Sequence, residues 1–76
     1  MKQLPSLNSR KVVQALKKFG FQEDRQRGSH LVMINQETKK RTVVPMHSGQ
    51  TIKKPLLKSI IEDDAGITIE KFLEEL

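Results

Sequence analysis

The 76-residue sequence contains no cysteine, no tryptophan and no tyrosine, and its aromatic side chains are three phenylalanines. Without cysteine there is neither disulfide nor thiolate chemistry, so a reducing cytoplasm is the expected compartment. No apolar run approaches the roughly 18–20 residues of a membrane-spanning helix, and the opening MKQLPSLNSR lacks the apolar centre of a signal peptide. The sequence therefore predicts one small cytoplasmic domain over residues 1–76.

Residues that hold metals or nucleotides are also scarce. The chain has two histidines and no H-E-x-x-H, P-loop, dinucleotide or G-x-S-x-G motif. The acidic run 62–64 consists of consecutive residues that fan around a helix, which is typical of a solvated helix end rather than a cation site. We therefore predict no metal site and no cofactor.

Positive charge is what the sequence has in excess. The net charge is +5, and residues 1–58 hold 13 basic and three acidic residues, whereas residues 59–76 hold one lysine and six acidic residues. A basic body suggests a polyanion partner such as RNA or DNA, with a plain lysine-rich surface as the alternative. Because aromatic platforms are lacking, contact should run through phosphates. The candidate contacts are Lys17, Lys18, Arg25, Arg27, Lys39, Lys40, Arg41, Lys53 and Lys54.

The hydrophobic pattern predicts an α+β fold. Asn8 or Ser9 can cap a first helix over 9–19 with Gly20 at its end, and Pro55 suits the start of a second helix. That second helix would bury Leu56, Leu57, Ile60 and Ile61. Three strands are predicted between the helices, with a loop over 48–54 and a short C-terminal helix after Thr68; the strands are 21–26, 29–35 and 41–47. The order is α-β-β-β-α, with an antiparallel three-stranded sheet and the helices on one face.

Two histidines are the candidates for chemistry, because histidine can both take and give a proton near neutral pH. His30 follows Gly28 and Ser29, where the backbone can approach a ligand closely. Pairing of adjacent strands can bring Arg25, Arg27 and Arg41 near it, and a general base beside several cations suits phosphoryl chemistry. His47 lies at the exit of the third strand, so antiparallel pairing predicts both histidines at one sheet end. A purely structural role for each is the alternative. Residues 31–34 are apolar on both faces, so the pattern leaves the face of His30 open.

The ordered set of motifs resembles the HicA (YcfA-like) toxins of HicAB toxin–antitoxin systems. That family shows a first helix ending in GF, a GSH or GGH opening an apolar strand, a VVPxHSG segment, and a helix ending in AGI or AGL. The corresponding segments here are KKFGF at 17–21, RGSHLVMI at 27–34, TVVPMHSG at 42–49 and LLKSIIEDDAGIT at 56–68. Many relatives read KKGTL where this chain reads KKPLL at 53–57, which puts in doubt any backbone contact of the glycine–threonine pair.

The resemblance implies a double-stranded-RNA-binding-like fold and a toxin that cleaves mRNA without a metal and so arrests translation. It places the catalytic histidine at His30 and the family's glycine at Gly28, with His47 as a candidate second catalytic group. It also implies a HicB-type antitoxin that covers the active face. The alternatives are a non-catalytic double-stranded-RNA-binding or partner-binding module on the same fold. A helix-turn-helix DNA reader is disfavoured by the strands between the helices.

Overall fold

The first helix begins and ends where its flanking residues predict. In the computed structural model, which describes residues 4–47 and 49–76, α1 spans Ser9–Lys18. The side chain of Asn8 caps it by accepting a hydrogen bond from the backbone N–H of Lys11 at 2.9 Å. Gly20 follows with φ +93°, a conformation that L side chains rarely adopt, so the chain can turn directly into the sheet.

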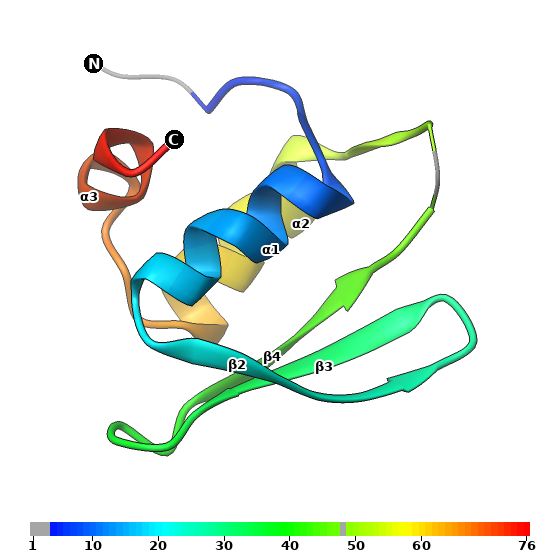
Figure 1. Ribbon diagram of the computed structural model, residues 1–76. Helices are drawn as coiled ribbons and strands as arrows, with labels where there is room; N and C mark the ends of the chain where they lie inside the picture. Colours follow the sequence, from blue (N-terminus) through cyan, green and yellow to red (C-terminus); the bar gives the residue numbers. More distant parts are fainter. Residues whose placement is uncertain (1–3, 48) are drawn as a thin grey trace.

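A three-stranded antiparallel sheet forms the second layer. Its strands are β2 (Phe21–Arg27), β3 (His30–Asn35) and β4 (Arg41–Pro45), in that order across the sheet. The helices lie on one face of this sheet and leave the other face uncovered (Figure 1). The predicted α+β arrangement is therefore confirmed.

The second helix begins at the predicted proline and then widens. Helix α2 (Lys54–Lys58) carries Pro55 in its first turn and continues as a π-helical segment, η1 (Ser59–Asp64). The widening shows in the hydrogen bond from Ala65 N–H to the Ile60 carbonyl, at 3.0 Å. The predicted short C-terminal helix is α3 (Ile69–Glu74). Within residues 4–47 and 49–76, no helix has the length and apolarity needed to cross a bilayer.

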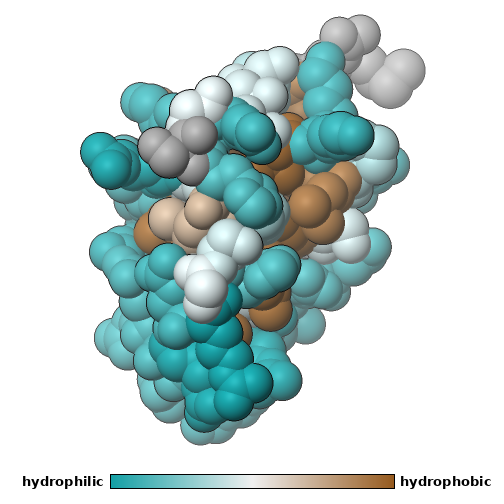
Figure 2. Space-filling model, turned by 90° about the vertical axis from the view of Figure 1, so that its right-hand side faces the viewer, coloured by the Kyte–Doolittle hydropathy of each residue, from teal (hydrophilic) through white to brown (hydrophobic). Residues whose placement is uncertain are grey.

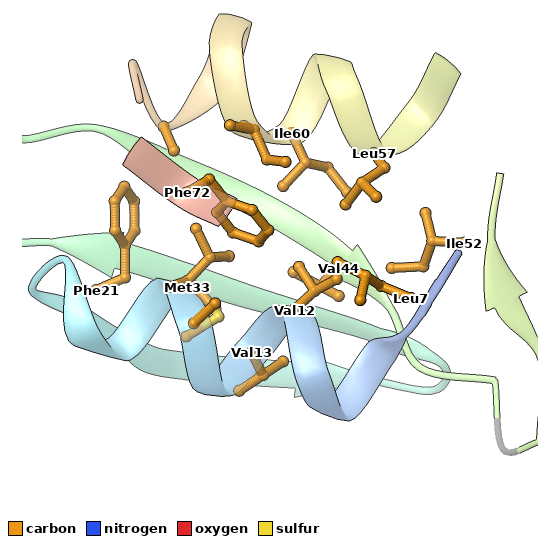
Figure 3. Packing of buried hydrophobic residues seen from close by; sticks show 14 of the residues in the cluster. Leu7, Val12, Val13, Phe21, Met33, Val44, Ile52, Leu57, Ile60 and Phe72 are labelled. Carbon is orange, nitrogen blue, oxygen red and sulfur yellow. The ribbon is translucent and has the colours of Figure 1, made fainter. Parts of the chain in front are cut away.

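The core lies between the helices and the inner face of the sheet. Figure 3 shows Met33 and Val44 of the sheet pointing into the same space as Val12 of α1 and Leu57 of α2. The prediction that Leu56 shares this core was wrong, because its side chain is 45% exposed. Neighbouring helical residues point about 100° apart, so burial of Leu57 turns Leu56 outward.

A short strand pairing that the sequence pattern missed joins the segment before α1 to the segment before α2. Strand β1 (Leu7–Asn8) pairs antiparallel with β5 (Thr51–Ile52), and Leu7 lies opposite Ile52 with both side chains buried. The expectation of a loop over 48–54 was therefore wrong at 51–52, while Ser48 lies outside the described residues. Each strand is too short to show alternation, and the contact that forms them is distant in sequence.

Asn35 ties the end of α1 to the β3–β4 hairpin. Its buried side chain donates to the Phe19 carbonyl at 3.1 Å and accepts from the N–H groups of Glu37 and Thr38 at 2.9 and 3.2 Å. It also lies directly under Gly20, where a Cβ atom would approach its Nδ2 to 3.2 Å. One side chain thus satisfies three backbone groups where helix, strand and hairpin meet.

We expect Asn35→Ala to lower the free energy of unfolding by about 2 kcal/mol, because these three backbone groups lose their partners. Urea unfolding measures the change. Gln36→Ala, the adjacent exposed position, is the matched control and should change stability by less than about 0.5 kcal/mol. Equal losses in the two variants would contradict the role assigned to Asn35.

Candidate functional site

His30 lies on the uncovered face of the sheet. Side chains alternate along β3, and Leu31 and Met33 are buried under the helices, so His30 points to the opposite, exposed face. In the sheet register His30 stands opposite Arg27 of β2 and Pro45 of β4. The structure thereby decides the face that the sequence pattern left open.

A β-bulge turns two arginines toward the face of His30. Strand β2 starts with Phe21 in the core, and regular alternation would put Arg25 and Arg27 on that same inner face. Pairing shifts between Glu23 and Arg25, so Asp24 has no partner on β3. After this shift Arg25 stands opposite Val32 and Arg27 opposite His30, and both arginines belong to the exposed face.

The exposed face carries a shallow hollow between three arginines. Arg41 of β4 stands opposite Ile34, four residues along β3 from His30 or about 13 Å at the usual rise per residue. The hollow has a volume of about 240 Å³. Its lining residues are Asp24, Arg25, Arg27, Val32, Arg41 and Val43. Arg27 is thus immediately beside His30. The expectation that Arg41 also lies near His30 was wrong, because the register puts Arg41 at the far end of β3.

The turn before His30 needs its glycine for conformation. Gly28 and Ser29 form a two-residue connection between β2 and β3, and Gly28 has φ +56°, as the first position of a type II′ hairpin turn requires. No atom lies within 4 Å of the place where a Cβ would stand, so the turn is also open to a ligand. The Met46 N–H donates to the Ser29 carbonyl and holds this turn against the end of β4.

His47 lies at the same end of the sheet as His30. It follows two residues after Pro45, which is directly opposite His30. Its side chain is exposed and borders two cavities, of about 370 and 200 Å³. Arg10 lines the first cavity and Lys53 lines the second, so each cavity that His47 borders also holds a cation.

The second of these cavities has an apolar wall. Pro45, Ile52 and the exposed Leu56 line it together with His47. Figure 2 views this side of the molecule: hydrophilic side chains fill the lower part, where the sheet lies, and a hydrophobic area opens above it. The end of the sheet therefore combines two imidazoles, several cations and an apolar wall.

The other predicted contacts do not join this group. Lys39 and Lys40 lie in the β3–β4 connection, at the opposite end of β3 from His30, and the Lys40 side chain lies against Gly66. Lys17 forms an ion pair with Glu23 at 2.7 Å, and Lys18 donates to the Glu75 carbonyl at 2.9 Å. Lys54 is the exception, because it begins α2 next to Lys53, which lines a cavity with His47, and it is exposed there.

Three residues near the site were not singled out from the sequence. Arg10 lies in the first turn of α1 and lines a cavity with His47, next to the β1–β5 pairing that the sequence pattern missed. Asp24, whose carboxylate lies 3.6 Å from the Arg25 side chain, and Val43, which is 42% exposed, depend on the bulge and the strand register. The FQEDRQ segment at 21–26 contains no sequence signal for the bulge or for the register of its pairing.

Within the described ranges, no three or more histidine, cysteine or acidic side chains gather where they could hold a metal ion. The acidic side chains have other contacts: Asp64 accepts from the Thr42 hydroxyl at 2.8 Å and Asp63 from the Ser59 hydroxyl at 3.3 Å.

Comparison with known protein families gives a match over most of the chain. A family described as the HicA toxin of bacterial toxin–antitoxin systems matches residues 9–67, which include both histidines and all three sheet-face arginines. No curated protein and no solved structure matches the chain.

We expect Ser9→Ala to lower the free energy of unfolding by about 1 kcal/mol. The buried Ser9 hydroxyl donates to the Pro45 carbonyl and so holds the start of α1 against the strand end that leads to His47. Chemical denaturation measures the loss, with the exposed Ser6→Ala as control. An unchanged stability for Ser9→Ala would show that this bond is not needed to hold the strand end.

Proposed function

The chain belongs to the HicA toxin family, and from this premise we propose that it is a cytoplasmic, metal-independent endoribonuclease that cleaves mRNA and is neutralised by a HicB-type antitoxin. Membership in a family of toxin–antitoxin systems itself implies an antitoxin partner. The observation that carries the proposed activity is the exposed His30 imidazole directly opposite Arg27, at an open turn. A general base beside a fixed cation is what transesterification of an RNA phosphate requires.

In the proposed reaction the neutral His30 imidazole takes the proton from a ribose 2′-hydroxyl. The 2′-oxygen then forms a bond to the adjacent phosphorus, and the bond from phosphorus to the 5′-oxygen breaks. Arg27 stabilises the additional negative charge on the phosphorane, because its guanidinium donates several hydrogen bonds to phosphate oxygens. The products are a 2′,3′-cyclic phosphate and a 5′-hydroxyl.

His47 is the proposed source of the proton for the departing 5′-oxygen. It lies at the same sheet end as His30, and cyclisation needs an acid and a base on opposite sides of one phosphate. Arg10 and Lys53 flank it in the two cavities, so the RNA backbone beyond the reacting phosphate meets cations there. Proton transfer of this kind contributes typically 10²–10⁴-fold to a rate.

The proposed RNA contacts separate into two groups. Those at the His30 end are Arg25, Arg27, Gly28, Ser29, Lys53 and Lys54, and those at the far end are Lys39, Lys40 and Arg41. Residues of the second group are too far from His30 to touch the reacting phosphate. Their contribution would be to affinity, and it should weaken with salt.

The proposed antitoxin contact follows from charge. The sheet face and its His30 end present arginines, and within the hollow Asp24 is the acidic lining residue. An antitoxin with an acidic surface would both associate quickly and exclude RNA from the same cations.

A non-catalytic binding module is the second candidate function. The exposed Val43 and the apolar wall around Leu56 favour it, because exposed apolar side chains beside cations suit a macromolecular partner as well as a substrate. RNA cleavage by the free chain separates the two functions.

We expect His30→Ala to lower the rate of RNA cleavage at least about 100-fold while the RNA dissociation constant changes little. The assay uses a long, weakly structured RNA in EDTA, with mapping of the product ends to detect cyclic phosphates. Gln14→Ala, on the exposed side of α1, is the control and should cleave like the parent. Equal cleavage by parent and His30→Ala would refute the assignment; RNA binding without cleavage by the parent would favour the binding module.

We expect His47→Ala to slow cleavage of ordinary RNA but not of a dinucleotide whose 5′-bridging oxygen is replaced by sulfur. A thiolate departs without a proton, so loss of the acid no longer matters. His30→Ala should stay slow on both substrates, because attack by the 2′-oxygen still needs the base. Equal slowing of both substrates by His47→Ala would refute its role as the acid.

A further inference from the structure

We propose that the uncovered face of the sheet binds the cleaved RNA as an unpaired single strand along β3, with bases on an apolar floor and phosphates on the surrounding arginines. This inference rests on the proposed function for the identity of RNA as substrate. It goes further in assigning the strandedness of that substrate and the surface that selects it.

The floor of the face is apolar and accessible. Val32 and Ile34 of β3 are half-buried, and Val43 of β4, directly opposite Val32, is 42% exposed. Covering an exposed apolar side chain with another apolar surface is favourable in free energy. The hollow above these residues has a volume of about 240 Å³. The floor therefore suits a flat apolar surface such as a nucleobase.

The rim of the face is cationic. Arg25, Arg27 and Arg41 come from both strands that flank β3, so the guanidinium groups stand on either side of the floor. Arginine contacts phosphate by paired hydrogen bonds and also stacks on bases through its planar face. An apolar floor flanked by arginines thus offers one surface for the bases and another for the phosphates of a single strand.

A duplex does not fit this arrangement. In an RNA helix the base faces are stacked inside, and a protein meets phosphates, 2′-hydroxyls and groove edges. The valine floor would then meet only charged or polar groups. Cleavage also requires the 2′-oxygen, the phosphorus and the 5′-oxygen to lie nearly in line, which an unpaired nucleotide can reach by rotating its backbone.

The sheet register defines the path of the bound RNA across the exposed face. The reacting phosphate lies at His30 and Arg27, and the neighbouring nucleotides pass over Val32 and Val43 toward Arg41, about 13 Å away. Arg41 therefore contacts a phosphate other than the one that reacts. Its contribution is to affinity and to the salt dependence of binding, at about 0.7 in the slope of log affinity against log salt for a single strand.

The test measures RNA binding by the full chain carrying His30→Ala, which prevents turnover during the measurement. Fluorescence anisotropy compares an unstructured single strand with a duplex of the same sequence, at several salt concentrations. Three further changes are made in this background: Arg41→Gln, Val43→Ser and, as the matched control on α3, Lys71→Gln. All three positions are exposed, and urea unfolding confirms that each variant is folded.

We expect the single strand to bind at least about tenfold more tightly than the duplex. Arg41→Gln should weaken binding of the single strand about three- to tenfold and reduce the salt slope by about 0.7. Val43→Ser should weaken it about threefold without changing the salt slope, because it removes apolar contact and no charge. Lys71→Gln should leave affinity for the single strand within about twofold.

Tighter binding of the duplex, or single-strand affinity unaffected by Val43→Ser, would overturn the inference. So would an equal effect of Arg41→Gln and Lys71→Gln, since contact would then depend on net charge alone. Val43→Ser that weakens only the binding of an acidic protein would also overturn it and make the face a protein-docking surface. Cleavage of RNA by the unmodified chain is assayed separately. If the chain cleaves RNA but gives one of the contrary binding results above, the single-stranded binding mode is refuted and the ribonuclease activity is not. If binding is as expected but RNA is not cleaved, the proposed ribonuclease activity is refuted.

Discussion

The one-sided burial of the sheet is the constraint on which the rest of this structure depends. A chain of 76 residues has helices for only one face, so Leu31, Met33 and Asn35 are buried on that side and the alternate side chains of β3 face outward. His30 belongs to the outward set. The packing that stabilises the domain therefore also exposes the imidazole, and stability and site accessibility have the same cause.

The bulge at Asp24 adds charge to that exposed face. One extra residue in β2 reverses the alternation, so that Arg25 and Arg27 leave the inner side and flank β3 on the outside. The same residue thus gathers on one face the cations that phosphate chemistry would use. Asp24 remains beside Arg25 at 3.6 Å and is the acidic lining residue of the hollow.

The two ends of the sheet have different contents. At one end, the turn at Gly28, the end of β4 and the start of α1 are held together by the Ser29–Met46 and Ser9–Pro45 hydrogen bonds, and both histidines are there. At the other end, Asn35 fixes the hairpin and the end of α1. The sequence alone shows only an excess of basic residues. The structure separates them into a proposed reaction end at His30 and His47 and a proposed binding end at Arg41.

The sequence by itself determined the α+β order, the cap at Thr68 and the family, because these depend on local spacing and on residues close together along the chain. It narrowed the first cap to Asn8 or Ser9, and the structure shows Asn8. It also predicted that antiparallel pairing would bring His30 and His47 to one sheet end. Only the tertiary structure decided the face of His30, since residues 31–34 are apolar on both sides and the choice depends on which side the helices cover. The bulge, the β1–β5 pairing and the exposure of Leu56 likewise follow from contacts between distant segments, which no local periodicity encodes.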